Sequence, residues 1–128
     1  MKRRKFVLTA IIAGTSVLVY GCFNTGPAGT VKNFYRSLEA GKVENAANMF
    51  SSTVVKTMGI DKLKTGLTQA VSEIQEKGGI NSIKILNEDV VGEVAEVTYT
   101  IEFANGTTET EITKLVKEND EWKISPSK

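Results

Sequence analysis

The chain has 128 residues, one cysteine, no histidine and a formal net charge of +1, which is the size of one domain. Four of its sixteen basic residues lie within the first five positions, so residues 22–128 carry twelve basic and fifteen acidic side chains, a net charge of −3. This composition argues against nucleic-acid binding and excludes an internal disulfide, histidine-dependent catalysis and the usual zinc sites.

The first 21 residues have the order of a signal peptide. A basic cluster at residues 2–5 precedes an apolar run from Phe6 to Tyr20, and Gly21 is a small residue at the expected cut. The competing interpretation is a retained transmembrane helix. Fifteen residues in a helix span only about 22 Å, less than the roughly 30 Å hydrocarbon core, so we favour the signal peptide.

Val19-Tyr20-Gly21-Cys22 resembles the bacterial lipobox, in which an aliphatic, a variable and a small residue precede a lipidated cysteine. The resemblance implies that Cys22 carries a diacylglycerol with palmitate-type chains, and two acyl chains are enough for stable anchoring. The alternative is an ordinary secretory signal with an incidental cysteine.

A lipoprotein would lie in the cell envelope, outside the cytoplasm. Phe23 is not the aspartate associated with inner-membrane retention, which implies the periplasmic face of the outer membrane in a cell with two membranes. In a cell with one membrane, the anchor would lie on the outer face of the cytoplasmic membrane.

Residues 22–29 are predicted to be the lipidated cysteine and a short tether, because they contain two glycines, one proline and no charge. The domain is predicted over residues 30–128, with Thr30 as the N-cap of its first helix. Helical spacing then occurs twice, in Val31, Phe34, Tyr35 and Leu38 and in Val43, Ala46, Ala47 and Phe50. A longer helix is predicted from Asp61 to Gly78.

From Ile80 onward the apolar period changes from 3.6 to 2, which predicts about four antiparallel strands and an α+β fold. Asn105-Gly106 is typical of a two-residue type I′ hairpin loop, and a second turn is expected near Asn119-Asp120. If Asn105 and Gly106 are the only loop residues, Tyr99 faces Ile112 and Glu102 faces Glu109. The face that receives the helices then carries Tyr99, Ile101, Phe103 and Ile112.

The same register places Glu102, Glu109 and Glu111 together on the opposite face. This group is interpreted as a solvated acidic surface, with a weak cation or basic-partner patch as the alternative. Lys114 falls on the inner face, where it either extends its ammonium group outward or acts as a base with a lowered pKa. We predict no metal site.

The segments Thr30–Tyr35, Leu38–Lys42 and Trp122–Ile124 are similar to those of small bacterial lipoprotein domains of unknown function in the nuclear transport factor 2-like superfamily. The resemblance implies helices packed into the concave side of a curved antiparallel sheet, a cone that often encloses a pocket. The superfamily contains isomerases and dehydratases built around a pocket Asp, His or Tyr, and also non-catalytic binding proteins.

We therefore expect a lipid-anchored, extracytoplasmic domain that binds a small apolar ligand or an envelope protein, with no catalytic residue and no cofactor. The alternative is a ketosteroid-isomerase-like enzyme that pairs Tyr35 or Tyr99 with a carboxylate, although none is predicted on the pocket face. The residues expected to line the pocket are Tyr35, Tyr99, Ile101, Phe103, Ile112 and Trp122.

Overall fold

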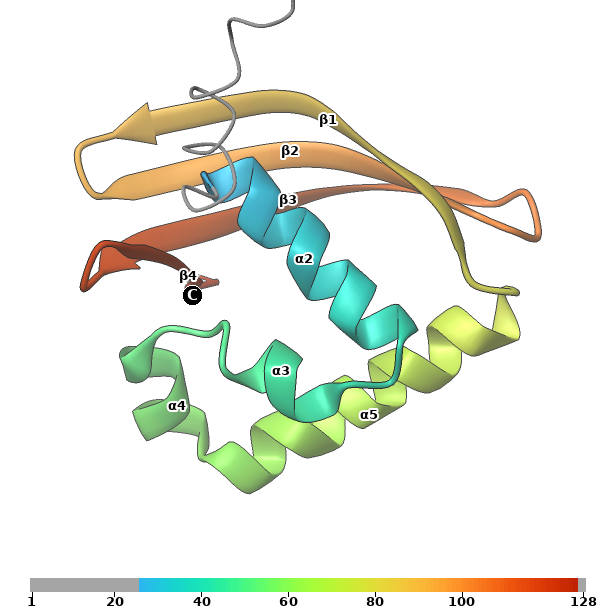
Figure 1. Ribbon diagram of the computed structural model, residues 1–128, viewed down its shortest axis with the longest axis horizontal. Helices are drawn as coiled ribbons and strands as arrows, with labels where there is room; N and C mark the ends of the chain where they lie inside the picture. Colours follow the sequence, from blue (N-terminus) through green and yellow to red (C-terminus); the bar gives the residue numbers. More distant parts are fainter. Residues whose placement is uncertain (1–25, 127–128) are drawn as a thin grey trace, which may run out of the picture.

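The computed structural model describes residues 26–126, so the predicted signal peptide and Cys22 lie outside the described residues. Within this range four helices precede four strands, which confirms the α+β class (Figure 1). The helices are α2 (Pro27–Glu39), α3 (Val43–Ala47), α4 (Ser52–Met58) and α5 (Ile60–Glu76). The strands are β1 (Ile80–Val91), β2 (Val94–Phe103), β3 (Thr108–Glu118) and β4 (Glu121–Ile124).

The four strands form one antiparallel sheet in the order β1-β2-β3-β4. The sheet curves around α2, which contacts β1, β2 and β4 on one side and α3 and α5 on the other (Figure 1). This arrangement is a cone with α2 inside it. No helix within residues 26–126 is both long and apolar enough to cross a bilayer.

The first helix begins four residues earlier than predicted. Gly26 is the N-cap and Pro27 occupies the first helical turn, where its missing N–H is not needed. Thr30 is buried within that turn, and both its backbone N–H and its hydroxyl donate to the Gly26 carbonyl, at 2.9 and 3.2 Å. The carboxylate of Glu88 in β1 accepts a hydrogen bond from the Ala28 N–H at 2.9 Å. The Thr30 N-cap is therefore wrong, because the capping acceptor comes from a strand distant in the sequence.

The register of β2 and β3 differs by one residue from the prediction. Tyr99 pairs with Glu111 and Ile101 pairs with Glu109, not with Ile112 and Thr110. Because side chains alternate along a strand, this single-residue difference moves every β3 side chain to the other face of the sheet.

The β2–β3 turn explains the difference. Its loop has three residues, Ala104 to Gly106, and the Phe103 N–H donates to the Thr107 carbonyl at 2.9 Å. Only Gly106 has a positive φ, of 95°, which is typical of a three-residue loop, and a type I′ turn needs two such residues. The Asn105 side chain instead accepts from the Thr107 N–H at 2.9 Å.

Three predictions about the sheet faces are therefore wrong. Ile112 lies on the convex face and is 60% exposed. Lys114 is also on the convex face, 4.0 Å from Glu96. Glu102 pairs with Thr108 on the convex side, whereas Glu109 and Glu111 share the concave face with Tyr99 and Ile101, so the three glutamates do not form one patch.

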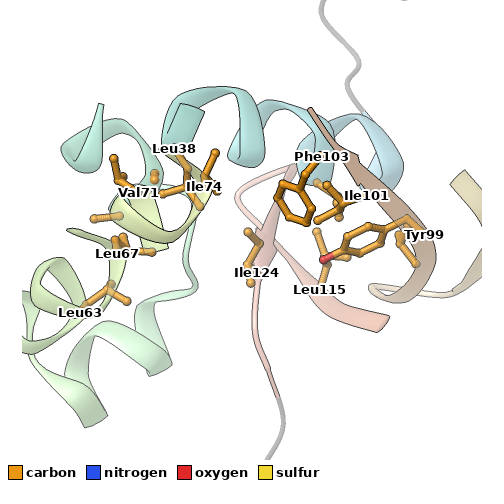
Figure 2. Packing of buried hydrophobic residues seen from close by; sticks show 14 of the residues in the cluster. Leu38, Leu63, Leu67, Val71, Ile74, Tyr99, Ile101, Phe103, Leu115 and Ile124 are labelled. Carbon is orange, nitrogen blue, oxygen red and sulfur yellow. The ribbon is translucent and has the colours of Figure 1, made fainter. Parts of the chain in front are cut away.

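The core lies between the concave face and the helices (Figure 2). The central strand β2 contributes every second residue from Ala95 to Phe103, and Leu115 and Ile124 are buried beside it. The helices contribute Leu38 from α2 and a stripe on α5 that consists of Leu63, Leu67, Val71 and Ile74.

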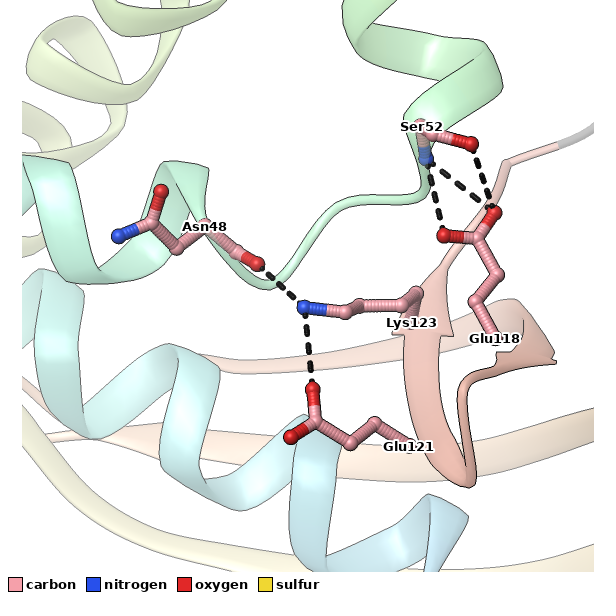
Figure 3. Close-up of polar contacts among 5 residues, drawn as sticks. All are labelled: Asn48, Ser52, Glu118, Glu121 and Lys123. Atoms are coloured by element: carbon pink, nitrogen blue, oxygen red, sulfur yellow. Dashed lines mark hydrogen bonds and ion pairs between the residues drawn. The ribbon is translucent and has the colours of Figure 1, made fainter.

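The β3–β4 hairpin joins the sheet to α3 and α4 (Figure 3). Its turn residues Asn119 and Asp120 both have positive φ, 52° and 66°, so the type I′ geometry expected at Asn105-Gly106 occurs here. The Glu118 carboxylate accepts hydrogen bonds from the Ser52 N–H and hydroxyl, at 3.1 to 3.2 Å. The Lys123 ammonium donates to the Asn48 carbonyl at 2.9 Å. These contacts hold the short last strand against the helices.

Candidate functional site

A cavity of about 160 Å³ lies between α2, α5 and the concave face, at the end of the sheet that carries the β2–β3 turn. Six of its nine lining residues are aliphatic or aromatic, and the other three are charged. The lining residues are Tyr35, Leu38, Ala70, Glu73, Ile74, Lys77, Ile101, Phe103 and Glu109.

Three hydroxyl groups form a chain that begins at the cavity wall. The hydroxyl oxygens of Tyr35 and Tyr99 are 2.9 Å apart, and that of Tyr99 lies 2.7 Å from the Thr113 hydroxyl oxygen. The two tyrosine rings meet edge to face, with centroids 5.6 Å apart. If Thr113 donates to Tyr99 and Tyr99 donates to Tyr35, the Tyr35 proton is available to a ligand.

Both phenols are held in the neutral form. Burial raises the pKa of Tyr35 far above the ordinary tyrosine value, and Tyr99, Glu111 and Glu109 add to the shift. Burial also raises the pKa of Tyr99, which is 1% exposed. Two phenols that keep their protons serve as hydrogen-bond donors and not as bases.

An ion pair lies beside the cavity. The Lys77 ammonium, at the end of α5, is 2.7 Å from the Glu109 carboxylate and 4.5 Å from the centroid of the Phe103 ring. The hydrogen bond to Glu109 raises the pKa of Lys77, so the ammonium group keeps its charge at neutral pH. The cavity wall therefore combines this ion pair with apolar side chains such as Leu38 and Ile74.

Carboxylates lie on the same side of the sheet as the tyrosines but accept no hydrogen bond from their hydroxyls. Glu111 is paired with Tyr99 across the β2–β3 ladder, on the concave side. Within residues 26–126, the Tyr35 and Tyr99 hydroxyls bond to each other and to Thr113, and neither donates to a carboxylate. In the same part of the chain, no three acidic side chains converge in a way that could hold a metal ion.

The structure brings together four of the six residues expected at the pocket. Tyr35, Ile101 and Phe103 line the cavity, and Tyr99 lies behind Tyr35. Ile112 is on the other face of the sheet, because the predicted register was wrong. Trp122 packs against the core in β4, where it pairs with Lys117.

Three site residues were missed by the sequence analysis: Lys77, Glu109 and Thr113. Glu109 and Thr113 were assigned to the convex side by the register error. A three-residue loop around Asn105-Gly106 is the alternative pattern that would have placed them on the concave side. Nothing in the sequence pairs Lys77 with Glu109, which lies 32 positions away.

A family model described as a domain of unknown function, DUF4878, matches residues 20–125. The chain belongs to this family. The DUF4878 domain is similar in structure to a Campylobacter jejuni protein described as an NTF2-like transpeptidase, with a TM-score of 0.68. The two chains are 19% identical, and the match covers 77% of this chain and 96% of the other. This likeness confirms the nuclear transport factor 2-like fold and says nothing of activity. No curated protein matches the chain.

Proposed function

We propose that this DUF4878 domain is the ligand-binding part of a lipid-anchored, extracytoplasmic lipoprotein, and that it binds without catalysis. The observation that supports binding most directly is the cavity, whose apolar wall of Leu38, Ile74, Ile101 and Phe103 lies beside a neutral Tyr35 hydroxyl. Apolar pockets with a few convergent polar groups are the usual form of a small-molecule site.

The size of the cavity limits the ligand. A dry cavity of roughly 150 Å³ holds a molecule the size of benzene, so about 160 Å³ suits one ring or one short branched chain. The Tyr35 hydroxyl favours a ligand with a hydrogen-bond acceptor. An apolar side chain of an envelope protein partner satisfies the same conditions.

The state of the tyrosines argues against catalysis. An isomerase-type reaction needs a base within hydrogen-bond reach of the transferred proton, with a pKa near the working pH. Tyr35 and Tyr99 keep their protons because they are buried, and their hydroxyls bond to each other and to Thr113. Neutral phenols in this arrangement position a ligand and do not remove a proton from it.

One observation favours the second candidate, an enzyme of the ketosteroid-isomerase kind. Glu111 lies on the concave face opposite Tyr99 and so provides a carboxylate near the hydroxyl chain. Under this alternative the Tyr35 hydroxyl polarises a ketone and Glu111 moves the proton. Turnover of a small β,γ-unsaturated ketone by the unaltered protein, lost in Glu111→Gln, would establish the enzyme and contradict the binding proposal.

Ligand-observed NMR with p-cresol as the probe tests the cavity. We expect binding by the unaltered domain and its loss in Ala70→Leu, because the larger side chain fills the space beside Ile74. Ile112→Leu changes an exposed residue on the convex face, away from the cavity, and must leave binding unchanged. Equal binding by all three proteins, or by none, would contradict the proposed site.

Metabolic labelling with radioactive palmitate tests the anchor. The unaltered protein is expected to incorporate label and to sediment with membranes, because a diacylated cysteine binds a bilayer stably. Cys22→Ala removes the sole cysteine of the chain and is expected to remain unlabelled. Labelling that persists in Cys22→Ala would overturn the lipoprotein assignment.

A further inference from the structure

The tip of the β1–β2 hairpin carries exposed aliphatic side chains. We call Val90, Val91 and Val94 the valine tip; they are 48, 74 and 52% exposed. The chain turns between them at Gly92, whose φ is 61°, and Glu93. Val91 and Val94 pair with each other on the convex side, and Val90, which pairs with Ala95, lies on the other face of the hairpin. Hairpin tips normally carry polar residues, so three exposed valines around one turn indicate an interaction surface.

The other two hairpins do not share this feature. The β2–β3 loop contains Asn105 and Gly106 and leads into Thr107, and the β3–β4 turn contains Asn119 and Asp120 between two glutamates. The β3–β4 turn lies at the same end of the sheet as the valine tip, because Val94 pairs with Val116. Apolar exposure is thus a property of one hairpin and not of all turns in this fold.

The chain enters the domain at the valine end of the sheet. The Ala28 N–H, in the first turn of α2, donates to the Glu88 carboxylate at 2.9 Å. Glu88 precedes Val91 by three residues, which is about 10 Å along a strand. Figure 1 shows α2 beginning over the part of the sheet near the β1–β2 hairpin and running toward the opposite end.

The proposed lipid on Cys22 must be close to this entry point. Three residues separate Cys22 from Gly26, so the two Cα atoms are at most about 14 Å apart. This span is similar to the distance of about 10 Å from Glu88 to Val91. A bilayer that holds the Cys22 lipid therefore lies within reach of the valine tip. The β2–β3 end, about a full strand length further away, is not held near it.

We propose that the valine tip rests in the interfacial layer of the membrane that holds the Cys22 lipid, and that this contact orients the domain. The cavity opens beside Lys77 and Glu109, at the other end of the sheet, so it faces away from the membrane. The inference rests on the proposed lipid anchor. It adds a second contact, made by protein side chains, that fixes which end of the domain meets the bilayer.

The charged side chains near the valine tip indicate which lipid headgroups it favours. Asp89, Glu93 and Glu96 are exposed near the valines, and the nearby Lys114 approaches Glu96 at 4.0 Å. Carboxylates are repelled by anionic headgroups, so the tip suits zwitterionic phospholipid. We therefore expect weaker contact with vesicles rich in phosphatidylglycerol than with phosphatidylcholine vesicles at low salt.

Tethered vesicles test the contact without relying on natural lipidation. A chain of residues 22–128, which contains the whole described core, is coupled through Cys22 to a maleimide lipid in phosphatidylcholine vesicles. In a Trp122→Phe background, one tryptophan is introduced by Val91→Trp or, as the matched control at the far end, by Thr108→Trp. Brominated acyl chains should quench Val91→Trp roughly twofold and Thr108→Trp hardly at all, since bromine quenches tryptophan only at short range and only the tip is expected to reach the headgroup/acyl boundary.

Hydrogen exchange on the tethered protein without introduced tryptophan provides a second readout. Amides of residues 91–94 should exchange more slowly on vesicles than in solution, and Val91→Glu should remove that protection. Equal quenching at both ends, or no protection at the tip, would overturn the proposal.

The experimental outcomes distinguish a failure of the valine-tip proposal from a failure of the lipid-anchor proposal. Because the maleimide lipid imposes the anchor, absent quenching refutes the valine contact even if palmitate labelling succeeds. Self-association in solution that Val91→Glu abolishes, with no quenching on vesicles, would assign the tip to a second copy of the chain and overturn the membrane contact. Labelling that fails while tethered quenching succeeds refutes the natural anchor alone.

Discussion

Leu115 and Ile112 are both aliphatic residues of β3, three positions apart, but they lie on opposite faces of the sheet and differ in exposure to solvent. Leu115 is fully buried on the concave face beneath the helices, whereas Ile112 is 60% exposed on the convex face. Their hydrophobicity is similar, so the register of the strand alone decides their environment. The concave face carries both the core and the cavity beside Tyr35.

The concave face is itself divided along its length. Near Ala95 and Leu115 it is apolar and covered. Toward the β2–β3 turn the β3 side chains on this face become Thr113, Glu111 and Glu109, next to the tyrosines. The polar site thus forms where the helices no longer cover the sheet completely, which lets the cavity contact both a core and a charged rim.

The largest difference between the two faces should appear when Leu115 and Ile112 are each truncated. Leu115→Ala leaves a cavity in a closed core and should lower the free energy of unfolding by about 2–5 kcal/mol. Ile112→Ala should change it by no more than about 0.5 kcal/mol, because the side chain is exposed. Urea denaturation followed by circular dichroism measures both. Similar losses for the two variants would refute the observed register.

Alkaline pH should weaken the concave face through its tyrosines. Residues 22–128 contain only two tyrosines, Tyr35 and Tyr99. Burial raises both pKa values, so above about pH 10 the unfolded chain loses protons that the folded chain keeps. The unfolded state is then favoured, and stability falls as pH rises beyond that point.

Absorbance at 295 nm checks this directly. The folded protein should show little phenolate near pH 10.5, and addition of urea at that pH should release the signal of both tyrosines. A folded protein that titrates with an ordinary tyrosine midpoint would show that the two rings are not buried.

The hydroxyl chain should contribute a smaller amount to stability. Tyr99→Phe removes the central hydroxyl and leaves Thr113 and Tyr35 without their shared partner, at a cost of about 1–3 kcal/mol. Tyr35→Phe removes one bond at the cavity wall and should cost about 0.5–1.5 kcal/mol. Chemical denaturation of the two variants gives the order. A larger loss of stability for Tyr35→Phe than for Tyr99→Phe would contradict the central position of Tyr99 in the hydroxyl chain.

The smallest expected change in stability concerns a glycine of the β2–β3 turn, which is compared with a glycine of α5. Gly106→Ala places a side chain at φ 95° and should destabilise by about 1 kcal/mol, although nothing lies within 4 Å of the new carbon. Gly66→Ala lies on the exposed side of α5 with open space and should stabilise by about 0.5–1 kcal/mol. Thermal unfolding of both variants tests the pair, and a neutral Gly106→Ala would argue for a different loop.

The sequence by itself determined that helices precede antiparallel strands and which face of β2 points inward, but its helical spacing marked three helices and not the short α4. Periodic apolar residues are a local property, and β2 alternates without interruption from Ala95 to Phe103, so Tyr99, Ile101 and Phe103 were placed correctly. The fold class followed from the change of period at Ile80, and the nuclear transport factor 2-like arrangement was correct for the same elements.

Only the tertiary structure decided the register of β3, the start of α2 and the composition of the site. Asn105-Gly106 suits a loop of two or of three residues, so these two residues alone do not fix the register, and burial of alternate β3 side chains beneath the helices favours the three-residue loop. The first turn of α2 is capped by Glu88, 60 residues away, and Lys77 meets Glu109 across 32 residues. Contacts of this kind leave no periodic trace in a sequence, because they are selected by the packing of elements that are far apart in the chain.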